Sequence, residues 1–76
     1  MDKIKLEKLR NKITKEFNIK FFNGEINFIN MYEWKYTVDA VNSKAFENIS
    51  EDIIDTLLSK ENSLEVLYEM AVEFHN

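Results

Sequence analysis

The stretch IKFFNGEINF, residues 19–28, decides the fold that this sequence predicts. Its Asn23-Gly24 pair is typical of a type I′ β-turn, because both central residues of that turn need a positive φ. A two-residue loop at this position pairs Phe21 with Ile26 and Ile19 with Phe28, so these four side chains share one face, whereas Phe22 points away from it. The spacing therefore predicts a β-hairpin over residues 19–28.

A second pattern follows the predicted hairpin in residues 33–39, EWKYTVD, where apolar side chains occupy every second position. This alternation predicts a third strand with Trp34, Tyr36 and Val38 facing inward. A helix is the alternative, because one apolar set also has helical spacing: Met31, Trp34, Val38 and Val41. Aromatic and β-branched residues directly after a hairpin favour the strand.

Helical periodicity dominates the rest of the chain. Residues 2–17 predict an amphipathic helix that ends near Asn18, and its apolar stripe is Leu6, Leu9, Ile13 and Phe17. Residues 43–60 predict a short first piece and a longer second helix, with Ser43 and Ser50 as N-caps. Residues 63–75 predict a last helix that is capped by Asn62 or Ser63.

These elements predict a single α+β domain over residues 1–76. The expected order is a helix, a three-stranded antiparallel sheet made of the hairpin and the third strand, and then two helices packed on one face. The last helix has an apolar arc wider than one packing face needs, which indicates a central position or a face left for a partner, such as a second copy.

Few residues in this chain are suited to catalysis or to metal binding. The sequence has no cysteine, and its one histidine, His75, is the penultimate residue. No histidine pair and no calcium-loop spacing is present, so no metal site is expected. The single glycine lies in the predicted hairpin, so no glycine-rich phosphate loop is expected. We therefore predict a non-enzymatic protein without a cofactor.

The apolar residues are too dispersed for a membrane-spanning segment, which needs about 18 consecutive apolar residues. The first residues, MDKIK, also lack the apolar core of a signal peptide. These features predict a soluble protein of the cytoplasm, which would be the host cytoplasm if the chain is phage-encoded. No membrane partner is expected.

Charge is divided unequally along the chain, whose net charge is −4. Residues 1–20 contain seven basic and three acidic side chains, a balance of +4, whereas residues 21–76 contain three basic and eleven acidic ones, a balance of −8. A negative surface repels nucleic-acid phosphates and attracts basic proteins. The expected partner is therefore a protein with a basic surface, and direct nucleic-acid binding is not expected.

Two charged sets are the candidate binding residues. The acidic set lies on the last two predicted helices: Glu51, Asp52, Asp55, Glu61, Glu65, Glu69 and Glu73. The basic set forms a stripe on the first predicted helix: Lys5, Lys8, Lys12 and Lys15. Four of the acidic residues, Glu61, Glu65, Glu69 and Glu73, recur every four residues and form an acidic ladder. This ladder is open to three interpretations, which are a solvated face, pairing with the basic stripe of the same molecule, and contact with a basic groove of a partner.

Aromatic residues are concentrated in residues 17–36, where most are expected to form the core. Phe22, Tyr32 and Tyr36 are the members that would mark a protein-binding patch if they are exposed.

In length, charge and predicted element order, the chain resembles small acidic phage-encoded nuclease inhibitors, including anti-CRISPR proteins. The resemblance involves no aligned motif. It implies that the acidic set occupies the nucleic-acid-binding surface of a nuclease. Two alternatives remain open: a homo-oligomeric structural or regulatory domain, and a nucleic-acid binder that uses the basic stripe of the first helix.

Overall fold

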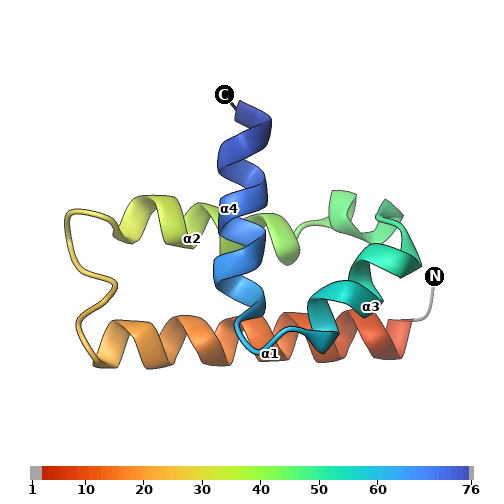
Figure 1. The fold of residues 1–76 in the computed structure, drawn as a ribbon, viewed down its shortest axis with the longest axis horizontal. Coiled ribbons are helices and arrows are strands. Elements are labelled where there is room, and N and C mark those ends of the chain that lie inside the picture. Colours follow the sequence, from red (N-terminus) through yellow and green to blue (C-terminus); the bar gives the residue numbers. More distant parts are fainter. Residues whose placement is uncertain (1–2, 76) are drawn as a thin grey trace.

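The computed structural model describes residues 3–75, with side chains up to residue 71. Its elements are the helices α1 (Lys3–Phe22), α2 (Met31–Val41), α3 (Glu51–Ser59) and α4 (Ser63–His75), and the short 3-10 helix η1 (Lys44–Asn48). The part of the chain so described contains no strand (Figure 1). The fold is therefore all-helical, and the predicted α+β class is wrong.

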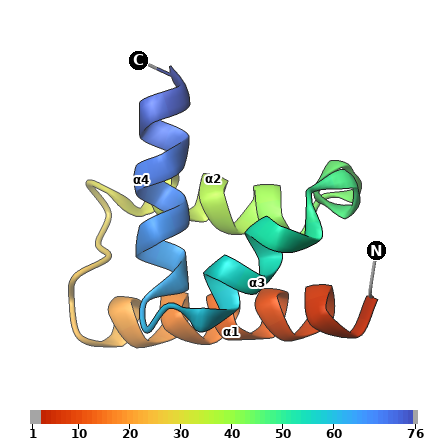
Figure 2. The same cartoon turned by 45° about the vertical axis from the view of Figure 1, so that its right-hand side comes forward.

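α1 is the longest of the described helices, and the other helices pack along its length. α2 runs back beside α1 after the loop of residues 23–30, and α3 packs on the N-terminal half of α1 (Figure 1). α4 stands crosswise to α1 and α2 in both views (Figures 1 and 2). α4 contacts α1, α2 and α3, which supports the first of the two alternatives for its wide apolar arc, a central position.

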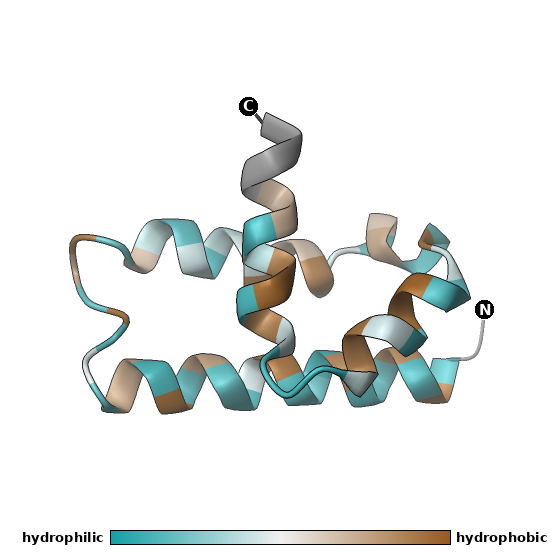
Figure 3. Cartoon of the chain, viewed as in Figure 1, coloured by the Kyte–Doolittle hydropathy of each residue, from teal (hydrophilic) through white to brown (hydrophobic). Residues whose placement is uncertain are grey.

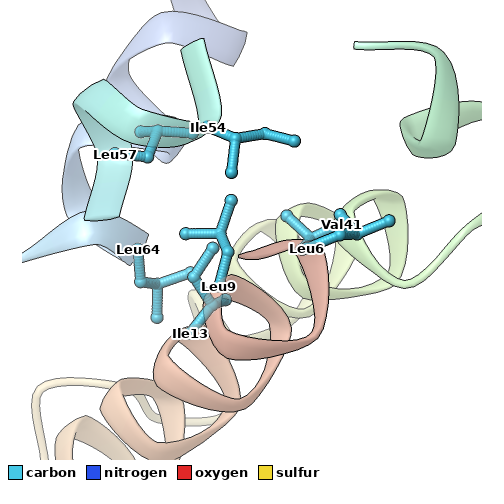
Figure 4. Close-up of a cluster of buried hydrophobic side chains, with 7 residues drawn as sticks. All are labelled: Leu6, Leu9, Ile13, Val41, Ile54, Leu57 and Leu64. Atoms are coloured by element: carbon cyan, nitrogen blue, oxygen red, sulfur yellow. The ribbon is translucent and has the colours of Figure 1, made fainter. Parts of the chain in front are cut away.

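The core forms where α1 meets the other three helices (Figure 4). Leu6, Leu9 and Ile13 extend from α1 toward the side chains that the other helices supply. Those side chains are Val41 of α2, Ile54 and Leu57 of α3, and Leu64 of α4. The predicted apolar stripe of the first helix is thus confirmed, with Phe17 packed at the edge of the core.

The predicted hairpin is wrong because its Asn-Gly pair ends a helix. α1 continues past Asn18 to Phe22, and Gly24 follows with a φ of +85°. The Gly24 N–H donates to the Phe21 carbonyl at 3.3 Å, a hydrogen bond typical of a helix C-cap. A C-cap and a type I′ turn both need a residue with positive φ, so this dipeptide suits either structure.

The predicted third strand is also wrong, and the helical alternative is correct. Residues 31–41 form α2, which buries Thr37 and Val41 and packs Trp34 and Val38 against the core. Tyr36, expected to face inward, is exposed. Spacings of three and four residues place the buried positions on one face of a helix, whereas in a strand Val38 and Val41 would point to opposite faces. The outcome shows that packing against α1 and α4 outweighs the β propensity of these residues.

The two pieces predicted within residues 43–60 are confirmed as η1 and α3. The Ser50 hydroxyl accepts a hydrogen bond from the backbone N–H of Asp52, as an N-cap does. The bounds predicted for the last helix are those of α4. None of the helices over residues 3–75 has the length and apolar composition that crossing a bilayer requires.

Candidate functional site

The basic stripe of α1 is partly engaged in contacts with α3. The Lys5 Nζ lies 3.0 Å from the Asp55 carboxylate and 3.6 Å from that of Glu51. The hydrogen bond with Asp55 is the main cause that raises the pKa of Lys5, and the negative charges of Asp55 and Glu51 act in the same direction. Two members of the candidate acidic set, Glu51 and Asp55, are therefore paired within the molecule, although pairing with the basic stripe was one interpretation of the acidic ladder of the last helix.

Lys12 has a structural role at the end of α3. Its Nζ donates to the backbone carbonyls of Lys60 and Glu61, at 2.8 and 3.2 Å, and lies 3.2 Å from Glu16. Carbonyls at a helix C-terminus lack partners within the helix and carry partial negative charge, so a lysine is favourable there.

Glu16 is the N-terminal cap of α4, although it lies far away in sequence. Its carboxylate accepts hydrogen bonds from the backbone N–H groups of Ser63 and Leu64, at 2.9 and 3.2 Å. The Ser63 hydroxyl donates instead to the carbonyl of Leu57. The sequence predicted Asn62 or Ser63 as the cap, but the side chain that accepts from these N–H groups is Glu16 of α1, which lies too far away in sequence for a local pattern to reveal.

Arg10 binds the C-terminal end of α2. Its guanidinium donates to the carbonyl of Val41 at 2.8 Å and to that of Ser43 at 2.9 Å. Arg10, Lys12 and Glu16 thus bind the ends of three other helices, and each has the sign of charge that the helix dipole favours. These three polar residues of α1 are therefore part of the architecture.

Lys8 and Lys15 are the two stripe lysines left for external contacts. Both are exposed, and neither forms an ion pair with any side chain described in residues 3–71. The structure does not bring the four lysines together as one continuous phosphate-binding surface, because Lys5 and Lys12 are engaged.

The acidic ladder of the last helix is divided in the structure. Glu61 precedes α4, and Glu65 lies 3.8 Å from Lys20 of α1. Asp52, Glu61 and Glu69 are exposed and make no ion pair within residues 3–71. The side chain of Glu73 lies outside the described residues. Among the candidate acidic set, Asp52, Glu61 and Glu69 are thus the members left unpaired within residues 3–71, on α3, on the turn and on α4.

An aromatic stack joins α2 to α4. The rings of Trp34 and Tyr68 are parallel, with centroids 4.2 Å apart, and the Lys20 ammonium lies 5.4 Å from the Trp34 ring. The Tyr68 hydroxyl donates to Glu33 at 2.8 Å, and this hydrogen bond is the main cause that raises the pKa of Tyr68. Both rings are already stacked on each other, so this cluster holds helices together.

A group of exposed apolar side chains lies at the end of the molecule where a loop joins α1 to α2. We call this group, Phe22, Phe28, Ile29 and Tyr32, the aromatic end; their exposed fractions are 87%, 99%, 94% and 82%. Figure 3 shows the loop that joins α1 to α2 at the end of the molecule opposite the N-terminus. The condition set for a protein-binding patch is met, because Phe22, Tyr32 and Tyr36 are all exposed.

The sequence-based prediction did not identify Phe28 and Ile29 as surface residues. The incorrect hairpin placed Phe28 on its core face, whereas hydrogen bonds within the loop hold the segment outward. The Asn27 side chain accepts from the Ile29 N–H at 2.9 Å, and the Asn30 side chain accepts from the Asn27 N–H at 2.7 Å. The Asn residues of the loop were the available signal, because Asn favours such local turns.

The hollows found among the described residues are not enclosed. They are open and shallow, and no group of three or more metal-binding side chains occurs within the part of the chain searched. No protein-family model, no curated protein and no solved structure matches this chain. The resemblance to small nuclease inhibitors accordingly rests on length and charge, since the helix–sheet order is not the one adopted.

Proposed function

We propose that this chain is a non-enzymatic protein-binding module whose contact surface is the aromatic end. The observation that carries the proposal is the exposure of four large apolar side chains on one short segment. Monomeric proteins rarely expose apolar patches larger than a few hundred Å², and patches of that kind mark interaction sites. Aromatic residues are also enriched among the residues that dominate binding energy.

The loop is held in a defined shape, which favours a binding role. The Asn30 side-chain amide donates to the Glu25 carbonyl at 2.9 Å, in addition to the two loop hydrogen bonds of Asn27 and Asn30. Ile26 is buried beneath the loop and anchors it to the body of the protein. A preorganised loop loses less conformational entropy on binding, so more of its apolar contact appears as affinity.

A second candidate function is inhibition of a nucleic-acid enzyme through the free carboxylates. Asp52, Glu61 and Glu69 favour it, because they are exposed and unpaired within residues 3–71. Glu51 and Asp55 give it less support, because binding a basic partner would compete with Lys5 for them. The nucleic-acid-binding alternative has the least support, since it would rely chiefly on Lys8 and Lys15.

Two matched triple variants distinguish these functions in co-purification from the native host. The apolar variant combines Phe22→Ser, Phe28→Ser and Ile29→Ser, and the acidic variant combines Asp52→Asn, Glu61→Gln and Glu69→Gln. We expect the apolar variant to lose the captured protein and the acidic variant to retain it. Loss by the acidic variant alone would favour the inhibitor function, and retention by both variants would contradict both functions.

A further inference from the structure

We propose that the partner of the aromatic end is a second copy of this chain, bound through the outer face of α2. The inference rests on the proposed function, because it names the partner of the same surface. The outer face is defined by Tyr32, Lys35, Tyr36 and Asp39, which are exposed and line one shallow hollow of about 110 Å³. Their spacing places them on one side of the helix, opposite the buried residues of α2.

The outer face of α2 has charges that complement those of an identical face. Lys35 and Asp39 lie one helical turn apart, yet no ion pair joins them to each other or to another side chain in residues 3–71. A lysine that precedes the acid is the less favourable order for a pair within one helix. If two α2 helices pack antiparallel about an axis at the level of Thr37, Lys35 of each copy faces Asp39 of the other.

In the same antiparallel arrangement, the aromatic end of one copy would pack against an apolar hollow of the other. A shallow hollow of about 340 Å³ lies at the C-terminal end of α2 and is lined by Ala40, Ser43, Ala45, Phe46, Asn48 and Ile49. The aromatic end precedes the N-terminus of α2, and the hollow follows its C-terminus. Antiparallel packing of two α2 helices therefore places the aromatic end of each copy at the same end of the helix pair as the hollow of the other. Each copy supplies a projection and a hollow, as an isologous interface requires.

The apolar area available is sufficient for a specific dimer. An aromatic side chain buries roughly 150–250 Å². Three aromatic side chains and Ile29 therefore offer roughly 500–900 Å² in each copy, against about 800 Å² per partner in a standard interface. Apolar area alone would suit many proteins, so the self-complementary charge is what selects a second copy.

Charge exchange at the proposed axis is the first test. Sedimentation equilibrium over a concentration series should show a dimer for the wild type. Lys35→Glu and Asp39→Lys should each raise the dimer dissociation constant about tenfold or more, because each places two like-charge pairs across the axis. The double variant Lys35→Glu/Asp39→Lys should restore the wild-type value. Both positions are exposed, and circular dichroism checks that each variant is folded.

Cysteine cross-linking tests the geometry independently, because the chain contains no native cysteine. Tyr36→Cys lies close to the proposed axis, so mild oxidation should give a disulfide-linked dimer. Asn11→Cys, at an exposed position of α1, is the matched control and should remain a monomer.

A protein that stays monomeric throughout the concentration series would overturn this inference. So would a dimer that responds to neither single charge change, or one in which Asn11→Cys cross-links as readily as Tyr36→Cys. None of these results bears on the proposed function. That function is decided separately by whether the apolar triple variant loses a captured protein that the acidic variant retains.

Discussion

The carboxylate of Glu16 caps the N-terminus of α4 by accepting a hydrogen bond from the Ser63 N–H at 2.9 Å. The two residues are 47 positions apart, so this contact forms only when α1 and α4 have met. With Arg10 at the end of α2 and Lys12 at the end of α3, it makes α1 the helix to which the ends of all three other helices are bound.

Removal of this cap should destabilise the whole fold. We expect Glu16→Ala to lower the free energy of unfolding by about 2 kcal/mol, because two helix N–H groups lose a charged acceptor. Urea unfolding followed by circular dichroism measures the change. Glu7→Ala, at an exposed position of the same helix, is the control, and an equal loss in both variants would contradict the capping role.

The guanidinium of Arg10 should contribute through its two hydrogen bonds to the end of α2. Arg10→Met keeps much of the apolar stem, so we expect a loss of about 1–3 kcal/mol from the hydrogen bonds. Arg10→Lys should recover only part of it, because an ammonium cannot reproduce the planar fork. Thermal unfolding of these variants beside Lys8→Met provides the comparison, and Lys8→Met should change stability by less than about 0.5 kcal/mol.

The stability of the protein should fall at alkaline pH. In the folded state the pKa of Tyr68 is raised above its ordinary value of 10.0 by the hydrogen bond to Glu33. The neutral hydroxyl is thus favoured by folding, and its contribution is complete below about pH 10 and lost as the pH rises through the folded-state pKa. The pKa of Lys5 is also raised, from 10.5, so its contribution has the same sign.

The contribution of Tyr68 can be isolated with Tyr68→Phe, which keeps the ring. The variant should lose less stability than the wild type between pH 9 and 12, a window that follows from the ordinary tyrosine pKa of about 10. Fluorescence of Trp34, the one tryptophan, reports on the stacked ring directly. Identical alkaline profiles for both proteins would contradict the Tyr68–Glu33 assignment.

Substitution of an apolar residue should lower the free energy of unfolding strongly in the core and only slightly at the aromatic end. Leu9 is fully buried, so Leu9→Ala should cost about 2–5 kcal/mol of unfolding free energy. Phe28 is almost fully exposed, so Phe28→Ser should change stability by less than about 0.5 kcal/mol. A large loss of stability in Phe28→Ser under dilute, monomeric conditions would show that Phe28 packs within its own chain.

The sequence allowed correct prediction of the elements whose apolar residues recur at helical spacing. Leu6, Leu9 and Ile13 on α1 and the apolar face of α3 could be assigned because only a helix brings such residues together. Ser50 could be identified as a cap because its hydroxyl binds an N–H two residues away. These local signals are independent of the rest of the fold.

The errors occurred where two structures satisfy the same local pattern. Gly24 meets the need for positive φ in a turn and in a helix C-cap, and the pattern around Trp34 fits a strand and a helix. Contacts distant in sequence decide between these alternatives. The same is true of Arg10 and Glu16, whose roles depend on which helix ends lie beside α1.

The candidate site was predictable only in part. One interpretation paired the acidic ladder of the last helix with the basic stripe, but Lys5 of that stripe pairs with Asp55 of α3. Glu65 instead meets Lys20, which was not part of the stripe, because α4 crosses α1 near its C-terminal half. The exposure of Phe28 and Ile29 depended on the loop conformation, which the hairpin interpretation excluded.

The most direct test of the central claim, that the aromatic end is the binding surface, is photocross-linking in the native host. Benzoylphenylalanine replaces Phe28 in one variant and Glu69 in the other, and each is irradiated in living cells. We predict a specific cross-linked product from position 28, either a dimer or a complex with one other protein, and none from position 69. A product from position 69 with none from position 28 would contradict the account.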